Sequence, residues 1–131
     1  MSDSNDTVPV LDPSKLAEMT GDDVSLGLEV IDIFREQSGI WARMLDANLP
    51  PAQWADAAHT LKGSALSVGA MKLAESCSVA EALGRRTESE TVSPAAIGVA
   101  LSDTKDEIAA AIEAVAQLAY QLSLSGRFSL S

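Results

Sequence analysis

The chemically most distinctive residue of the chain is its single histidine, His59, which is followed by Lys62 and Gly63. Imidazole is a nucleophile at neutral pH, because a large share of it is uncharged there. Attack on a phosphoryl donor would give phosphohistidine, whose added oxygens carry strong negative charge. A lysine one helical turn away would offset that charge, and a glycine would let the group sit close to the helix. These residue types at this spacing favour phosphoryl transfer through a nucleophilic histidine.

The orientation of His59 follows from the helical pattern of residues 51–68. On a wheel of about 100° per residue, one arc about 100° wide is apolar. Its members are Trp54, Ala57, Ala58, Leu61, Ala65 and Val68. His59 lies about 160° from Leu61, and Gly63 also faces away from the apolar arc. We therefore expect the imidazole on the side of the helix that is turned away from the core.

The surroundings of His59 on this helix allow two readings. A lone exposed histidine beside a lysine is usually just a solvated surface, and a lone glycine in an alanine-rich helix often serves close helix packing. However, Gly63 faces away from the core and lowers helix stability by about 0.5–1 kcal/mol relative to alanine. The benefit that offsets this loss must be the free space beside the imidazole. Ala55 and Leu66 add an apolar collar that a partner could cover.

Composition and charge exclude several classes of function. The chain has 131 residues, enough for one domain, and its 47% hydrophobic residues include much alanine, which favours helices. A net charge of −10 disfavours nucleic acid and anionic membranes as ligands. One cysteine, Cys77, and one histidine cannot build a His/Cys metal site or an intrachain disulfide. Cys77 and both tryptophans fall on apolar stripes and are expected to be packing residues.

The ends of the chain carry no targeting or membrane signal. The N-terminus lacks the basic and apolar regions of a signal peptide, and no apolar run reaches the roughly 18 residues of a membrane span. We expect a cytoplasmic protein that is complete in itself, with a flexible N-terminus over 1–10, one domain over 11–122 and a C-terminal tail over 123–131.

Periodicity and capping residues predict one short and four long helices. The leading segment is a helix of one or two turns. Thr20 and Asp23 are read as the N-cap and the capping-box acid of the next helix. The Ser93-Pro94 pair opens the last one. The four long helices are expected over about 22–48, 51–68, 70–86 and 94–122. Because no alternating strand pattern occurs, we predict an all-α, antiparallel four-helix bundle with a short N-terminal helix.

The segment His59-Thr60-Leu61-Lys62-Gly63-Ser64, followed by Gly69, resembles the signature of histidine-containing phosphotransfer (HPt) domains. The resemblance extends through Ala70, Leu73, Cys77 and Glu81, and the helix layout fits the family over about 11–122. It implies a four-helix bundle that carries a phosphorylated histidine, His59, exposed on the second long helix. It also implies that Lys62 steadies the phosphoryl oxygens, that Gly63 gives clearance and that Ser64 occupies a small polar position at the phosphoryl site.

The position 22 residues after the histidine departs from this family. Some members have a glutamine there that bonds the imidazole, whereas this chain has Glu81. A carboxylate could orient the ring and make the attacking nitrogen more basic, but it would also favour the protonated imidazole. Arg85 matches a basic position of some members. The alternative is a plain surface pair between Glu81 and Arg85, four residues apart on one helix.

The resemblance also implies partners. Family members shuttle phosphoryl groups between aspartates of receiver domains, which belong to response regulators and hybrid histidine kinases. We expect Leu16 and Met19 of the leading segment to join Ala55 and Leu66 in docking the receiver, although that segment could equally cap the bundle. No nucleotide-binding motif occurs, so we expect a monomeric carrier, not an enzyme. It would hold no cofactor, and the magnesium ion would come from the receiver domain.

Two other functions stay open at this point. The chain could be the phosphoacceptor module of a chemotaxis-type kinase, phosphorylated directly by an ATP-binding domain. It could also be a helical-bundle adaptor that binds a partner without any phosphorylation, in which case His59 would be dispensable.

Overall fold

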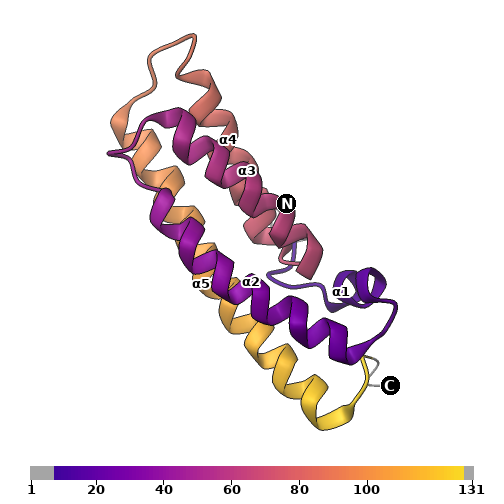
Figure 1. The fold of residues 1–131 in the computed structure, drawn as a ribbon. Helices are drawn as coiled ribbons and strands as arrows, with labels where there is room; N and C mark the ends of the chain where they lie inside the picture. Colours follow the sequence, from indigo (N-terminus) through magenta and orange to yellow (C-terminus); the bar gives the residue numbers. More distant parts are fainter. Residues whose placement is uncertain (1–7, 129–131) are drawn as a thin grey trace, which may run out of the picture.

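The computed structural model describes residues 8–128 and shows these as five α-helices, with no strand among them (Figure 1). In chain order they are α1 (Pro13–Thr20), α2 (Val24–Met44), α3 (Pro51–Val68), α4 (Met71–Arg86) and α5 (Pro94–Ser125). The predicted all-α class is confirmed.

The four long helices run alternately up and down and form a bundle. Helix α2 packs against α3, α3 against α4, α4 against α5, and α5 against α2, so the contacts close a ring. In Figure 1, α3 and α4 form a hairpin beside the N-terminal half of α5, while α2 also lies along the C-terminal half of α5. Helix α1 packs on α2 and α3. The antiparallel four-helix bundle with a short N-terminal helix is therefore the observed architecture.

The predicted start of the second helix is wrong in its capping residues. Thr20 is the last residue of α1, where its buried hydroxyl donates to the carbonyl of Leu16 at 2.9 Å. The carboxylate of Asp23 accepts from the backbone N–H of Leu26 at 3.0 Å, so Asp23 is the N-cap of α2. The reason is a left-handed turn at residues 21–22, which ends α1 before α2 begins.

Two helix ends also differ from the predicted ones. Helix α2 ends at Met44, not near residue 48, because residues 46–49 form a separate turn. Helix α5 continues to Ser125, three residues into the predicted tail, and ends at Gly126 with a φ of 72°. After this cap, Phe128 packs against α2, where a Cβ on Gly27 would lie 2.7 Å from its ring. Part of the predicted tail is thus packed on the bundle.

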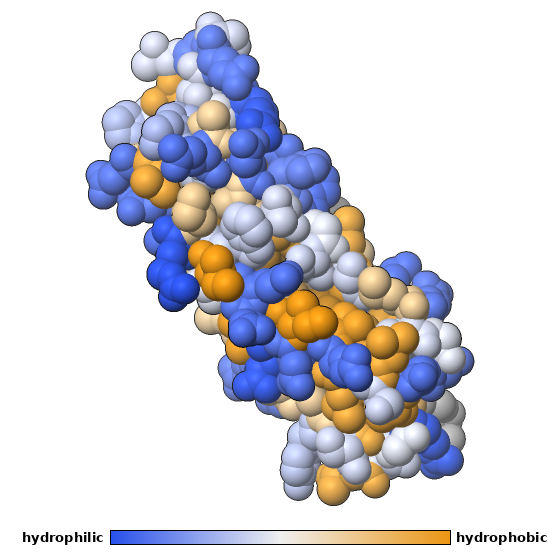
Figure 2. All heavy atoms as spheres, in the orientation of Figure 1, coloured by the Kyte–Doolittle hydropathy of each residue, from blue (hydrophilic) through white to orange (hydrophobic). Residues whose placement is uncertain are grey.

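The core lies where the apolar stripes meet, and the predicted inner face of α3 is confirmed. All six residues assigned to that face are buried. The largest fully buried side chains include Trp54, Leu61 and Leu73, and Cys77 is buried beside them. Figure 2 shows that much of the outer surface is polar, with apolar side chains gathered over α2 and next to α1. The core therefore fixes which side of α3 is turned towards solvent.

Helix α5 is long and apolar enough to cross a membrane by length and composition alone, with a mean hydropathy of 1.2 over its most apolar window. A mostly buried core helix can meet the same criterion, and 28% of this window is buried within the fold. Here the buried stripe of α5, which includes Leu101, Ile108 and Val115, packs within the bundle.

Candidate functional site

His59 lies midway along α3, with 68% of its side chain exposed. Its Nδ1 atom is 3.0 Å from Oε2 of Glu81 on α4, whose side chain is only 21% exposed. This is the only hydrogen bond of the imidazole within the described part of the chain. The ring is therefore held at one nitrogen by a neighbouring helix, and its other nitrogen, Nε2, has no hydrogen-bond partner among the described residues.

Small residues let α4 approach α3 closely enough for this contact. A Cβ on Gly84 would lie 2.7 Å from Cβ of Ala55 and 2.9 Å from the ring of Trp54. Only a glycine fits at that crossing. Glu81 lies three residues before Gly84, on the neighbouring turn of α4, so the close approach there brings its carboxylate to His59. Gly84 was not identified from the sequence, because a glycine in a helix does not reveal what it faces.

The same contact corrects one predicted docking residue. Ala55 is 0% exposed because α4 covers it at Gly84. It is therefore not part of an exposed collar around His59. The wheel placed Ala55 correctly relative to His59, but it could not show that a neighbouring helix covers that side.

Arg85 connects the two helices beside the histidine. Its Nη2 atom lies 2.6 Å from Oδ1 of Asp56 on α3 and 3.7 Å from Oε2 of Glu81. The hydrogen bond to Asp56 is the main reason that the pKa of Arg85 is raised. Arg85 thus contacts the carboxylate that holds the ring and has no bond to the ring itself. Asp56 was not predicted, although its place three residues before His59 put it on the same exposed side.

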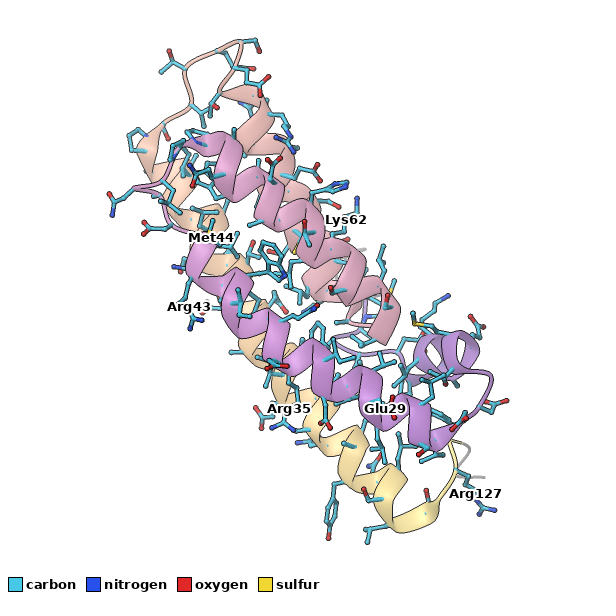
Figure 3. All side chains as sticks on the ribbon, viewed as in Figure 1. Glu29, Arg35, Arg43, Met44, Lys62 and Arg127 are labelled. Carbon is cyan, nitrogen blue, oxygen red and sulfur yellow. The ribbon has the colours of Figure 1, made fainter. Side chains whose placement is uncertain are left out.

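Lys62 and Gly63 lie on the exposed side of α3 beside the histidine. Lys62 projects from α3 and forms no ion pair with any described residue (Figure 3). A Cβ added to Gly63 would meet no atom within 4 Å. No packing contact in the described fold requires a glycine at this position, so the close-packing alternative is excluded for residues 8–128. The space beside the imidazole is open towards solvent.

Ser64, which the resemblance places at the phosphoryl site, lies on another side of α3 than His59. It lines a groove of 190 Å³ together with Met19 of α1 and Ile33 of α2. Five residues of helix rotate its side chain by about 140° from that of His59. Ser64 therefore faces α1 and α2, and its part in stabilising a phosphoryl group stays a prediction.

Of the other three predicted docking residues, two are exposed and one is buried. Met19 is 56% exposed, and Leu66 on α3 is 45% exposed. Both border a second shallow depression between α1 and α3, together with Lys15. Leu16, in contrast, is fully buried, so the prediction that it docks a partner is wrong. It faces the bundle because α1 needs an apolar anchor on its inner side.

Cys77 lies one turn before Glu81 on α4, directly beneath the site. Burial raises its pKa to about 12, an effect that Lys62 opposes and Glu81 reinforces. The thiol is therefore protonated at neutral pH and behaves as a small apolar side chain. The prediction that Cys77 is a packing residue is confirmed.

The fold and the site together define a helical bundle that presents one histidine, held by a carboxylate, on an exposed helix face. Comparison with known proteins agrees with this class. The model of the Hpt domain family matches residues 29–118. The crystal structure of the histidine phosphotransferase ShpA from Caulobacter crescentus is 30% identical in sequence, with a TM-score of 0.67. The match covers 90% of this chain and 98% of that one.

No curated protein sequence matches significantly. The chain belongs to the Hpt domain family and has a histidine phosphotransfer role in two-component signalling.

Proposed function

We propose that this protein carries a phosphoryl group on Nε2 of His59 between aspartates of receiver domains in a two-component phosphorelay. The single observation that carries this proposal is the hydrogen bond between Nδ1 of His59 and Oε2 of Glu81. It occupies one ring nitrogen and leaves the other facing solvent on a largely exposed side chain. A partner protein can reach a nucleophile in this position.

The proton positions in the transfer follow from that bond. With Nδ1–H donating to the carboxylate, the neutral tautomer has its lone pair on Nε2. Nε2 attacks the phosphorus of a receiver phosphoaspartate, so that a nitrogen–phosphorus bond forms as the bond to the aspartate oxygen breaks. The carboxylate of Glu81 stabilises the positive charge that develops on the ring. The reverse attack by a second receiver aspartate returns a neutral imidazole.

Lys62 and Gly63 would accommodate the phosphoryl group that is bound to His59. The ammonium of Lys62, which forms no ion pair with any described residue, would stabilise the phosphoryl oxygens, and the open space at Gly63 would admit them close to the helix. Arg85 contacts both Glu81 and Asp56, so it offsets two carboxylates that would otherwise repel the incoming charge. The magnesium ion required for transfer would be bound by the receiver domain. The protein then acts as a carrier and contributes no nucleotide site.

A surface next to His59 suits docking of a receiver domain. Leu66 lies two helical turns beyond the histidine and borders one depression with the exposed Met19 of α1. Met19 in turn lines the neighbouring groove with the exposed Ile33 of α2. Lys15 lies at the edge of the same surface. We call this surface, formed by Lys15, Met19, Ile33, Ser64, Leu66 and Ser67, the docking surface. Exposed apolar side chains gathered next to a reactive group are typical of a transient protein interface.

The test is transfer from a phosphorylated receiver domain. We expect the wild type to acquire acid-labile label and to pass it to a second receiver, whereas His59→Gln acquires none. Thr60→Ala, which alters the next exposed residue and leaves the imidazole intact, serves as the matched control and should label normally. Equal labelling of the wild type and His59→Gln would contradict the proposal.

One observation favours a second candidate, direct phosphorylation by the ATP-binding domain of a chemotaxis-type kinase. The group that holds the imidazole is a carboxylate, Oε2 of Glu81, where some family members have a glutamine. Incubation with such a kinase domain and ATP, in the absence of any receiver, distinguishes the two donors. Rapid labelling of His59 under these conditions would support the second candidate.

A further inference from the structure

The segment that precedes α1 crosses the turn between α3 and α4 and is bonded to it. The backbone N–H of Asp12 donates to the carbonyl of Gly69 at 2.8 Å. The backbone N–H of Lys72 donates to the carbonyl of Pro9 at 3.1 Å. The first bond joins the N-terminal segment to the end of the helix that carries His59, and the second joins it to the first turn of α4.

Gly69 makes this crossing possible for two reasons. Its φ of 86° is a left-handed conformation that favours glycine, and it ends α3. A Cβ at this position would also overlap the carbonyl oxygen of Asp12 and would lie 3.2 Å from Cβ of Lys15. The two other glycine caps of helices, Gly21 and Gly126, have similar φ values but open space around them. Gly69 is therefore the cap at which another part of the backbone lies directly against the glycine.

Asp12 links Gly69 to α1, because it is also the N-cap of that helix. Its carboxylate accepts from the backbone N–H of Ser14 at 3.1 Å and from the Ser14 hydroxyl at 2.6 Å, and so caps the helix. Leu16, one turn further on, is fully buried against the bundle. The start of α1 is thus fixed by Gly69, and its orientation is fixed by Leu16. Asp12 contacts Gly69 in two ways: its N–H donates to the Gly69 carbonyl, and its own carbonyl oxygen lies against the glycine. We call these two contacts the α1 latch.

Helix α1 in turn forms one wall of the docking surface. Met19 faces Ile33 of α2 on one side and Leu66 of α3 on the other, and Lys15 lies beside Leu66. None of these side chains is bonded to His59 or to Glu81. A displacement of α1 would therefore change the surface that a partner meets and leave the reacting group unchanged.

We propose that the α1 latch sets the affinity for the receiver domain, and that Asp12 and Gly69 are positioning residues for docking. This inference rests on the proposed function, since it names the surface on which the receiver binds. It assigns no part in the chemistry to α1. Loss of the latch therefore weakens binding of the receiver domain and leaves the nucleophilicity of His59 unchanged.

The experiment compares Gly69→Ala with Gly126→Ala. Both substitutions place an alanine at a left-handed helix cap, but only the first creates a clash. For Gly69→Ala we expect kcat/KM for transfer from a phosphorylated receiver to fall about tenfold or more, as for loss of a strong interface contact. The rate at saturating receiver should stay within about twofold, and Gly126→Ala should resemble the wild type. Hydrogen exchange should show faster exchange of the Asp12 and Lys72 amides in Gly69→Ala only.

A second variant covers the case in which Gly69→Ala unfolds. Met19→Ala removes the exposed side chain of the wall and leaves the latch intact, and we expect it to lower kcat/KM roughly fivefold or more. Labelling of His59 by phosphoramidate, which needs no docking surface, should be the same in all folded variants. Normal kcat/KM in a folded Gly69→Ala, or in Met19→Ala, would overturn the inference while leaving the proposed function standing. Failure of the wild type to accept phosphate from any receiver would overturn the proposed function instead.

Discussion

Nδ1 of His59 and Oε2 of Glu81 lie 3.0 Å apart, across the contact between two neighbouring helices. The ring is largely exposed, whereas the carboxylate is mostly covered. The covered carboxylate of Glu81 therefore orients the exposed imidazole of His59. This relationship distinguishes the two ring nitrogens, and the following predictions test its consequences and its structural supports.

Two replacements of Glu81 should distinguish its orientation of the imidazole from the effect of its negative charge. Glu81→Gln retains a hydrogen-bonding group towards Nδ1, whereas Glu81→Ala removes it, so we expect a modest loss for the first and roughly a tenfold or greater loss of transfer rate for the second. Nitrogen chemical shifts of the imidazole should report a mixture of tautomers in Glu81→Ala only. If Glu81→Ala transfers phosphate as fast as the wild type, the carboxylate has no orienting role.

Gly63→Ala should slow transfer while stabilising the fold. Alanine is the better helix former by about 0.5–1 kcal/mol, and its Cβ meets no described atom, so the free energy of unfolding should rise. The added methyl group narrows the space beside the imidazole and should lower the transfer rate. Gly98→Ala on α5 is the matched control, because it is equally open. It should stabilise the protein by a similar amount without any effect on transfer, as denaturant titration and transfer assays would show.

Gly84→Ala should have the opposite effect on stability. Its Cβ would lie 2.7 Å from Cβ of Ala55, so α3 and α4 would have to move apart, at a cost of about 1–3 kcal/mol. The separation should also weaken the bond between His59 and Glu81. Gly39→Ala, at an open position of α2, should stabilise slightly in the same denaturant titration. An unchanged midpoint for Gly84→Ala would show that the crossing tolerates a methyl group.

The thiol of Cys77 should be unreactive in the folded protein and should make stability depend on pH. Its pKa is raised to about 12 in the fold, against an ordinary value of about 8.5 in an unfolded chain. Above about pH 8.5 the unfolded state loses this proton first, so the free energy of unfolding falls as the pH rises. Cys77→Ala should show a smaller fall over the same range. Rapid modification of native Cys77 by a thiol reagent at pH 8 would contradict this account.

The sequence alone indicated much of this protein because helical periodicity reports the angle of each residue around its own axis. That angle was enough to place His59 and Gly63 on the exposed side of α3 and Cys77 in the core. The charge and spacing of Lys62 then indicated the kind of chemistry.

What the sequence could not determine is the angle at which one helix meets another. The burial of Ala55 and Leu16, the pairing of Arg85 with Asp56 and the crossing of Asp12 over Gly69 all depend on that angle. It is set by the packing of all the helices together, and no single stripe contains it. Only the tertiary structure therefore decided that a carboxylate 22 residues away holds the histidine.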